Sequence, residues 1–340
     1  MEIALDTPPM EAKLTGQIPA GDGWQFEPKW DGFRCLAFRG GDAVELMSKS
    51  GKPLGRYFPE IVEALLALKE RRFVLDGELV LPVGEVLSFA ALQLRLHPAA
   101  SRIARLSRET PAQLMLFDCL QLGEKVLADE PLTKRRSALE LFMKDAAGPR
   151  LLLSPCTTER EVAEKWFART GGALDGIVAK RLDEPYRAGE RAMTKVKQQR
   201  TADCVVGGYR LSGATVGSLL LGLYDSAGKL DYVGCTSSFS AEGRRELLAK
   251  LQPYRGPSAF TGSAPGGPSR WSRGRSREWE PLRAELVAEV TYDQVTGQRF
   301  RHGTTFLRWR PDKAPHQCTL DQLEHELRPA VLGRVLEAAA

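Results

Sequence analysis

The stretch EPKWDGFR, residues 27–34, decides how this sequence is interpreted. It places Lys29 between a strand-like run and a turn at Asp31-Gly32. A lysine amine becomes a nucleophile only after it loses its proton, so it needs partial burial or neighbouring cations that favour the neutral form. A surface lysine beside a turn is the alternative interpretation, and the stretch alone does not separate the two.

Further fragments follow this stretch in a fixed order. They are Ser48–Gly51, Leu75–Glu78, Leu116–Asp118, Asp175–Lys180, Lys195–Lys197 and Arg308–Lys313. The ordered set resembles the covalent nucleotidyltransferase superfamily, and most closely the bacterial ATP-dependent DNA ligases of the LigC type and the ligase domain of LigD. The resemblance extends from about residue 9 to about residue 325. It implies a DNA ligase.

Length and composition agree with an ordinary globular protein. A chain of 340 residues favours two domains, and its 43% hydrophobic and 27% charged residues do not indicate disorder. No apolar run reaches the roughly 18 residues that a membrane helix needs, and the N-terminus lacks a signal pattern. We therefore expect a cytoplasmic, nucleoid-associated protein that does not bind membranes.

Cysteine and histidine usage argues against a metal centre of the zinc type. The six cysteines and four histidines have no spacing typical of a zinc or redox motif. Several cysteines lie in apolar strand-like runs, so we expect reduced thiols in the core.

The pattern of the chain predicts an α+β domain followed by an all-β domain. Residues 71–75 and 113–117 read as strands, and apolar residues recur at helical spacing at 61–68 and 132–142. After residue 200 come five short strands, near 203–211, 218–225, 230–237, 286–295 and 305–310, with one helix near 241–254. Residues 256–268 read as a loop. We expect an adenylation (nucleotidyltransferase) domain of antiparallel sheets and helices at 1–200, and an OB-fold barrel domain with a C-terminal tail at 201–340.

The resemblance implies the reaction and its catalytic groups. Lys29 is expected to attack ATP and to carry AMP as a phosphoramidate, before AMP passes to a 5′-phosphate and is displaced by a 3′-hydroxyl. Positive charges near an amine favour its neutral form and also stabilise phosphoryl oxygens. Lys180, Lys195 and Lys197 are expected to supply them. The last motif is expected to orient pyrophosphate when the two domains close, through Arg310, Asp312 and Lys313.

The resemblance also implies a nucleotide pocket and a divalent cation, Mg²⁺ or Mn²⁺. Phe117 is expected to stack on adenine, Val178 to cover its other face, and Glu27 to accept from the exocyclic amine. Glu78 and Asp175 are expected to hold the ribose and the metal, because Mg²⁺ prefers carboxylate oxygens at phosphate sites. The remaining expected nucleotide contacts are Trp30, Arg34, Lys49, Lys180, Lys195 and Lys197.

Basic residues outside the motifs suggest contacts to DNA. The net charge of +5 is modest, but arginines gather in two places. The expected DNA contacts are Lys49, Arg270, Arg273, Arg275, Arg277, Arg299 and Arg301. A solvated basic face is the alternative. Nicked duplex DNA is the expected partner, a Ku-like end-binding protein or a repair polymerase is a further candidate, and we expect a monomer.

Three positions depart from the family pattern. Many ligases have glutamate at the position of Asp175, arginine at Lys49 and tryptophan near Met193, so metal geometry and the DNA contact depend on this chain's own residues. Twenty-eight residues precede Lys29, which leaves no expected room for a helical DNA-binding domain or for a nicotinamide-recognition domain. We expect a minimal two-domain ligase that uses ATP rather than NAD.

Two alternatives remain open at the level of sequence. An RNA ligase or a GTP-dependent capping guanylyltransferase shares the lysine, the barrel and most motifs. A non-catalytic OB-type nucleic-acid-binding protein is the non-enzymatic alternative. The nucleotide that labels Lys29, or the lack of labelling, separates these three classes.

Overall fold

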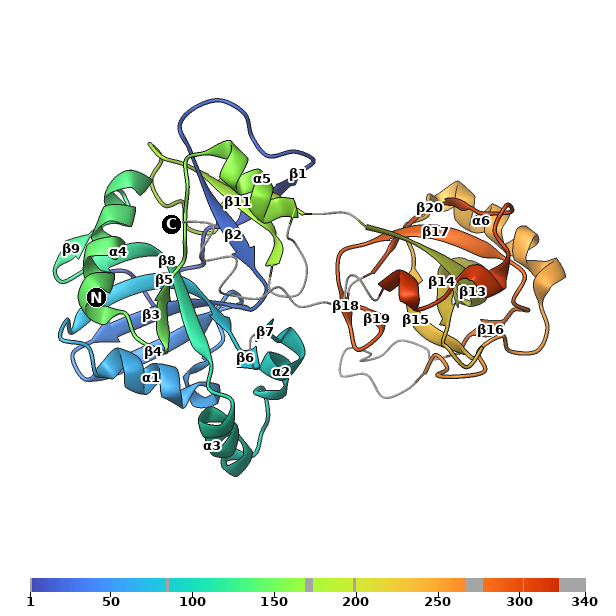
Figure 1. The fold of residues 1–340 in the computed structure, drawn as a ribbon, viewed down its shortest axis with the longest axis horizontal. Coiled ribbons are helices and arrows are strands. Elements are labelled where there is room, and N and C mark those ends of the chain that lie inside the picture. The colour runs from blue at the N-terminus through green and yellow to red at the C-terminus, as the bar shows by residue number, and fades with distance from the viewer. Residues whose placement is uncertain are drawn as a thin grey trace. The chain divides into compact units, whose positions relative to one another are not determined.

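The computed structural model describes residues 2–83, 86–168, 174–197, 200–266, 278–301 and 303–323. The chain divides into two compact units, the first extending to residue 198 and the second running from residue 199 to residue 328. Figure 1 shows the first unit mainly in blue and green and the second in yellow to red. The first unit contains both helices and strands, whereas strands predominate in the second.

One sheet of the first unit, here named the lysine sheet, has the strand order β1-β12-β11-β2. Its strands are β1 (Ala12–Thr15), β12 (Met193–Val196), β11 (Leu174–Arg181) and β2 (Trp24–Trp30). Only β1 and β12 pair in parallel. Helix α5 (Arg160–Ala168) packs its Ala163 and Trp166 against β2 and β11, and so covers one face of the lysine sheet (Figure 1).

The second sheet of this unit, the central sheet, has the order β10-β8-β5-β3-β4, with β9 paired to β8. Its strands are β10 (Leu151–Leu153), β8 (Gln113–Leu122), β5 (Arg72–Val80), β3 (Phe33–Gly40), β4 (Ala43–Ser48) and β9 (Lys125–Val126). The strands predicted at 71–75 and 113–117 are confirmed, and both extend further. The antiparallel prediction holds except at β1/β12 and β10/β8, which are parallel.

Helices form where apolar residues recur at helical spacing. Helix α1 (Pro59–Leu66) buries Ile61 and Leu65, and α4 (Leu132–Ala146) buries Leu139 among others, as the pattern predicts. The remaining elements are η1 (Gly55–Tyr57), β6 (Pro82–Val83), β7 (Val86–Leu87), α2 (Phe89–Leu94) and α3 (Ala100–Glu109).

An apolar cluster joins the lysine sheet to the central sheet. Met193 of β12 lies in one cluster with Leu36, Phe38, Val74 and Leu120 of the central sheet. Each such side chain stabilises the fold by about 1.5–3 kcal/mol when fully buried. This cluster therefore holds the two sheets face to face, and it borders the space between them into which polar side chains of both sheets point.

The main sheet of the second unit is antiparallel and has six strands, in the order β15-β14-β13-β17-β20 with β16 paired to β13. Its elements are β13 (Arg200–Ser212), β14 (Thr215–Tyr224), β15 (Leu230–Thr236), α6 (Ala241–Leu251), η2 (Gln252–Tyr254), β16 (Glu280–Pro281), β17 (Val287–Tyr292), β18 (Val295–Thr296), β19 (Arg299–Phe300), β20 (Thr305–Trp309) and η3 (Pro315–Gln317). The five predicted strands and the predicted helix are confirmed. The loop predicted at 256–268 forms neither helix nor strand over 256–266, and residues 267 and 268 lie outside the described residues.

The barrel of the second unit is partly open. In the described part of the chain, the edge strands β15 and β20 share no ladder. A single bridge pairs Thr236 with Thr304, and the Thr236 hydroxyl donates to the Thr304 carbonyl over 2.9 Å. A partly open five-stranded barrel is the usual form of an OB fold.

Thiols and membrane-spanning elements were also expected features. All six cysteines carry free thiols, and Cys35, Cys119, Cys204 and Cys318 are buried. Over the described ranges, no helix combines the length and apolar character needed to cross a bilayer.

A buried arginine caps the C-terminal end of helix α1. Arg39 of β3 is only 3% exposed. Its Nη1 donates to the carbonyls of Leu65, Leu68 and Glu70 over 2.7–2.8 Å, and its Nη2 donates to Leu66 over 2.9 Å. The last carbonyls of a helix have no partner within the helix, so this one side chain satisfies groups that burial would otherwise leave unpaired.

We expect Arg39→Ala to lower the free energy of unfolding by about 3 kcal/mol, because several buried carbonyls lose their donor. Urea denaturation of the full chain measures this. Arg71→Ala is the control, since Arg71 is exposed and pairs with Asp42 at the surface, and it should change the free energy by less than about 0.5 kcal/mol. Equally small effects for both variants would contradict the role of Arg39.

Candidate active site

Polar side chains line the face of the lysine sheet that α5 leaves free. On β2, Gln25, Glu27 and Lys29 are spaced by two, and the strand period places them on one face. Phe26 and Ile177 point instead into the cluster beneath α5. The antiparallel register sets three residues of β11 opposite the polar ones, in the order Lys180, Val178 and Gly176.

Asp175 occupies a β-bulge at the start of β11, where the register with β2 shifts. Gly176 has φ +143°, and a Cβ there would meet the Val196 carbonyl oxygen at 2.0 Å, so only glycine fits. The Asp175 carboxylate oxygen Oδ2 lies 2.6 Å from Lys29 Nζ and 2.8 Å from Lys197 Nζ. One largely buried oxygen therefore bridges the two lysines.

Lys195 completes a cluster of positive charges. Burial lowers the pKa of Lys195, and the charges of Lys29, Lys197 and Lys49 lower it further, whereas Asp175 raises it. The positive charges of these lysines repel one another, and together they form a positively charged region that attracts anions. The phosphate groups of nucleotides and nucleic acids are anions of this kind.

Lys49 stands at the rim of this cluster. It follows β4, its side chain is 60% exposed, and its Nζ lies 3.1 Å from Glu11 Oε1. An exposed ion pair of this type contributes little stability, so Lys49 can exchange its partner for a ligand at small cost.

A buried hydrogen-bonded chain fixes Arg34 on β3. Its Nε and Nη2 each donate to Asp76 over 2.6 Å. The Tyr186 hydroxyl donates to Asp76 Oδ2 over 2.7 Å and accepts from the Met10 amide over 2.8 Å. Two parallel charged hydrogen bonds orient a guanidinium plane, and this one lies 4.6 Å from the centre of the Phe117 ring.

Phe117 occupies a bulge of β8, where the pairing with β5 skips one residue. The Lys180 ammonium lies 4.7 Å from the centre of its ring. Lys180 is 3% exposed, and its Nζ lies 2.8 Å from Glu27 Oε1 and 3.8 Å from Asp118 Oδ2. Among the described residues, no partner of this ammonium meets hydrogen-bond geometry. A buried donor with spare capacity is typical of a ligand site.

Glu78 of β5 interacts electrostatically with charged side chains of both sheets. Burial raises the pKa of Glu78 to about 7, although the charges of Lys29 and Arg34 lower it. The turn at Gly32 lies against this residue, because a Cβ on Gly32 would meet Glu78 Cγ at 2.9 Å. The carboxyl group is therefore poised between its two protonation states near neutral pH.

Carboxylates for a divalent cation come from the same region. The described residues contain no group of three or more histidine, cysteine, aspartate or glutamate side chains arranged to hold a metal. Magnesium at phosphate sites uses one or two carboxylates together with phosphate oxygens and water. Asp175 contacts Lys29, and Glu78 interacts with its charge. Their donor chemistry fits a cation that also binds a phosphate.

The structure does not bring Trp30 together with the other predicted nucleotide contacts. Trp30 ends β2 and belongs to a cluster with residues of β5, β8 and β11, not to the cluster beneath α5. It is 3% exposed and packs with Val80 and Met115, and its indole Nε1 donates to Ser154 Oγ over 2.9 Å. These contacts place Trp30 in the core, and its contact with a nucleotide stays a prediction.

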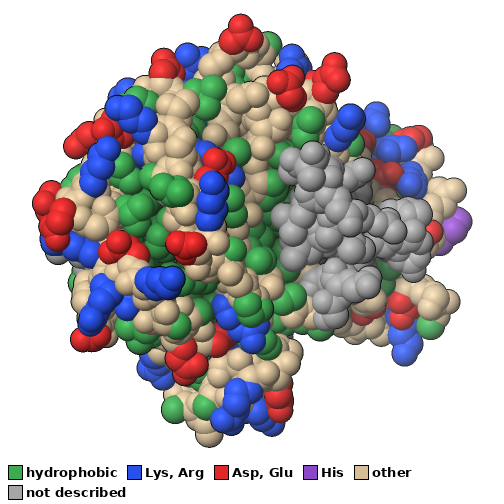
Figure 2. All heavy atoms as spheres, turned by 60° about the vertical axis from the view of Figure 1, so that its left-hand side comes forward, with side chains coloured by type: hydrophobic (Ala, Val, Ile, Leu, Met, Phe, Trp, Pro, Cys, Tyr) green, Lys and Arg blue, Asp and Glu red, His purple; other side chains and the backbone are tan. Residues whose placement is uncertain are grey.

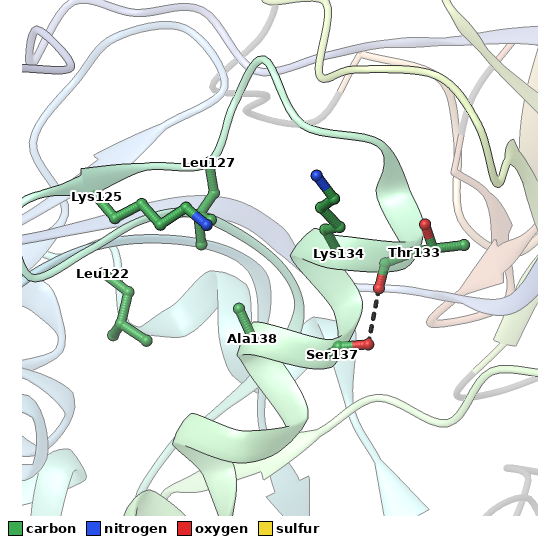
Figure 3. Close-up of a pocket in the computed structure, with 7 residues that line it drawn as sticks. All are labelled: Leu122, Lys125, Leu127, Thr133, Lys134, Ser137 and Ala138. Carbon is green, nitrogen blue, oxygen red and sulfur yellow. Dashed lines mark hydrogen bonds between the residues drawn. The ribbon is translucent and has the colours of Figure 1, made fainter.

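A surface hollow lies away from these residues. Figure 3 shows it between the end of β8 and the first turns of α4, with Lys125 and Lys134 at its edge. Both lysines pair with Glu130. The hollow contains none of the predicted site residues among those that line it, so it does not belong to the candidate active site.

Asp203 of β13 organises the last motif within the second unit. Arg310 Nη1 donates to Asp203 Oδ1 over 2.9 Å, and Lys313 Nζ donates to Oδ2 over 2.7 Å. Arg310 Nη2 also donates to Asp312 Oδ2 over 2.8 Å, and this hydrogen bond lowers the pKa of Asp312 to about 2. The three predicted residues of this motif therefore form one ion network.

The predicted DNA contacts are only partly described. The Arg299 guanidinium carbon lies 5.4 Å from the centre of the Tyr232 ring, and Arg301 donates to the Gln294 side chain. Figure 2 shows basic side chains interspersed with acidic ones over the face that it presents. The remaining predicted arginines lie outside the described residues, and they are Arg270, Arg273, Arg275 and Arg277.

Several residues that contact the predicted ones were not predicted from the sequence, among them Gln25, Asp76, Tyr186 and Asp203. A signal existed for Asp76, which is two residues before Glu78 on a strand and so shares its face. Tyr186 and Asp203 act on partners more than 100 residues away in sequence. Such contacts depend on tertiary structure and leave no local pattern.

The two facing sheets, the lysine-rich face and the OB-type second unit together define a two-domain nucleotidyltransferase. Residues 9–197 match the family described as ATP dependent DNA ligase domain, and residues 212–313 match the ATP dependent DNA ligase C terminal region. The chain therefore belongs to the ATP-dependent DNA ligase family.

Individual relatives agree with this assignment. DNA ligase C2 from Mycolicibacterium smegmatis is 48% identical over 334 residues, which cover 93% of this chain and 94% of that protein. DNA ligase C from Mycobacterium tuberculosis is 43% identical over 338 residues, covering 94% of each chain. A solved structure from work on Lig E DNA ligases shares the fold, with a TM-score of 0.58 at 18% identity over 89% of this chain and 99% of that chain. The resemblance to the LigC type is confirmed.

Glu78→Gln should change how stability depends on pH. The unfolded chain releases the Glu78 proton near pH 4.5 and the folded chain near pH 7. Between these values only the folded state keeps the proton, so the free energy of unfolding falls as pH rises, by up to about 1.4 kcal/mol per pH unit. We expect the variant to lack this part of the slope in urea denaturation. Parallel pH curves for the two proteins would contradict it.

Proposed function

We propose that this protein seals nicks in duplex DNA through an AMP bound covalently to Lys29, with ATP as the source of AMP. The observation that carries the proposal is the bridging of Lys29 and Lys197 by Asp175, beside Lys195. This arrangement holds an amine among the positive charges that a triphosphate requires.

In the first step, the Lys29 amine attacks the α-phosphorus of ATP. A nitrogen–phosphorus bond forms, the bond from that phosphorus to the pyrophosphate oxygen breaks, and pyrophosphate leaves. The Lys29 proton can leave along the 2.6 Å contact to Asp175 Oδ2. Lys197 Nζ also lies 2.8 Å from this Asp175 oxygen. Lys197 can therefore keep its contact with Asp175 when Lys29 leaves the carboxylate as a free amine.

Lys195 and Lys197 stabilise the phosphoryl oxygens during this transfer. Charge develops on these oxygens in the transition state, and preorganised cations nearby lower its energy. Asp175 and Glu78 would hold a divalent cation, Mg²⁺ or Mn²⁺. When bound, such a cation neutralises phosphate charge and positions the phosphates.

The nucleotide lies in the space between the two sheets. Phe117 stacks on the adenine, Val178 covers its other face, and Glu27 accepts from its exocyclic amine. Arg34, oriented by Asp76, reaches the ribose together with Lys49. The spare donor capacity of the buried Lys180 ammonium supports a ligand at this place, and Trp30 stays a predicted contact of this nucleotide.

The second unit contributes the last motif. We assign residues 1–200 to an adenylation domain and residues 201–340 to an OB-fold domain with a C-terminal tail. Arg310, Asp312 and Lys313 orient the pyrophosphate when the domains close, and the domains then reopen to admit the nick. The ordered ion network around Asp203 supports this role, because it presents Arg310 and Lys313 in a fixed arrangement.

Nicked duplex DNA is the substrate of the later steps. AMP passes from Lys29 to the 5′-phosphate, and the 3′-hydroxyl displaces it as the phosphodiester bond forms. Basic residues near the site and on the second unit bind the DNA backbone. We assign this role to Lys49, Arg270, Arg273, Arg275, Arg277, Arg299 and Arg301.

The biological setting of this activity is DNA repair in the cytoplasm, at the nucleoid. The LigD relatives are named as proteins of non-homologous end joining and share 30% identity with 86% of this chain, which supports a repair role. A monomer that a Ku-like protein or a repair polymerase recruits is consistent with this setting.

Lys29→Ala should abolish labelling of the protein by α-labelled ATP, because the nucleophile is lost. The same variant should still seal DNA that already carries AMP, since only the first step uses the amine. Lys134→Ala is the control, an exposed lysine paired with Glu130, and it should label normally. Labelling of Lys29→Ala, or equal loss of labelling and sealing, would contradict the assignment of Lys29 as the nucleophile of the first step.

Asp203→Ala should slow labelling by about 10- to 100-fold, since Arg310 and Lys313 lose the hydrogen bonds that orient them. Sealing of pre-adenylated DNA should change by less than about threefold. Glu246→Ala, on the exposed face of α6, serves as the control. If both steps slow equally, Asp203 supports the fold of the second unit rather than the first step.

A further inference from the structure

Gln25 and Lys180 converge on one oxygen of Glu27. Gln25 Nε2 donates to Glu27 Oε1 over 2.8 Å, and Lys180 Nζ lies 2.8 Å from the same oxygen. Gln25 and Lys180 stand directly opposite each other on β2 and β11. All three side chains are 4% exposed or less. The contact is therefore a built feature of the lysine sheet.

The orientation of the Gln25 amide follows from its partner. A carboxylate only accepts hydrogen bonds, so the amide group that faces it must be the NH₂. A fixed donor from the strand and a cation from the neighbouring strand both engage Oε1. The second oxygen, Oε2, keeps its capacity to accept.

Lys180 alone would not fix this carboxylate. An ammonium is a point charge on a flexible stem, and its partners can share it. Lys180 Nζ also lies 3.8 Å from Asp118 Oδ2 and 4.7 Å from the centre of the Phe117 ring. Asp118 in turn accepts from Arg135 Nε over 2.8 Å, so its carboxylate is held in place. Without Gln25, Lys180 can move between Glu27 and Asp118.

We propose that Gln25 is a positioning residue that sets the choice of purine, by holding Glu27 Oε2 toward the 6-position of the base. An acceptor at this place pairs with the 6-amino group of adenine and opposes the 6-oxo group of guanine or hypoxanthine. A buried acceptor that loses its donor discriminates strongly between such analogues. This inference rests on the proposed function, which places the base beside Glu27.

The test compares two nucleotides in the first step alone. Single-turnover labelling of the full chain is measured with ATP and with inosine triphosphate, which carries the 6-oxo group. For Gln25→Met, which keeps the length but removes the donor, we expect the efficiency with ATP to fall about tenfold. We expect the efficiency with inosine triphosphate to change less than about threefold, so the preference for ATP falls.

The ratio of the two efficiencies distinguishes specificity from stability. Equal losses with both nucleotides would mean that Gln25 only supports the fold, and this result would overturn the proposal. An unchanged ratio with unchanged rates would overturn it as well. Gln25→Asn keeps an amide, but its side chain is too short to reach Glu27 from the strand. It should therefore also lower the ratio of the efficiency with ATP to that with inosine triphosphate. This variant tests the proposal if Gln25→Met does not fold.

Gln121→Met is the matched control. Gln121 is a buried glutamine of β8 whose side-chain amide donates to the Gly123 carbonyl over 3.1 Å, so it resembles Gln25 in burial and bonding. The ratio of the efficiency with ATP to that with inosine triphosphate should be the same in Gln121→Met as in the natural protein. If the natural protein takes no label from ATP, the proposed function fails. Equilibrium binding of the two nucleotides then tests Gln25 separately, through the same ratio.

Discussion

The contact of Asp175 with Lys29 and Lys197 is the interaction on which the rest of the site depends. Several lysines on neighbouring strands would repel one another, and a carboxylate 2.6 and 2.8 Å from two of them offsets this repulsion. The carboxylate reaches both because a bulge and the left-handed backbone of Gly176 turn it out of the strand. Backbone geometry thus sets the electrostatics.

A second bulge repeats this arrangement on the central sheet. The extra residue of β8 is Phe117, and the side chains that flank its ring, Arg34 and Lys180, come one from each sheet. Both bulges break regular pairing where the two sheets face each other. Regular strands provide stability and spacing, and the irregular residues carry the side chains that the chemistry needs. Family membership and this geometry therefore support the same function.

Much of the fold was predictable, because apolar spacing fixes strands and helices locally. The five strands of the second unit and helices α1 and α4 follow from such patterns. The motif residues around Lys29 were predictable through resemblance. Trp30 packs in the core and donates to Ser154, and its contact with the nucleotide stays a prediction. The Gln25 and Asp203 contacts could not be predicted, because strand register and distant pairing decide which side chains meet.

The measurement that tests the central claim most directly is peptide mapping by mass spectrometry after incubation of the protein with ATP and Mg²⁺. The account predicts an AMP adduct on Lys29, within the peptide that spans the turn at Asp31-Gly32. An adduct on Lys195 or Lys197 would show that the cluster provides a different nucleophile. A protein that carries no adduct at any lysine would contradict the claim that this cluster activates an amine toward ATP.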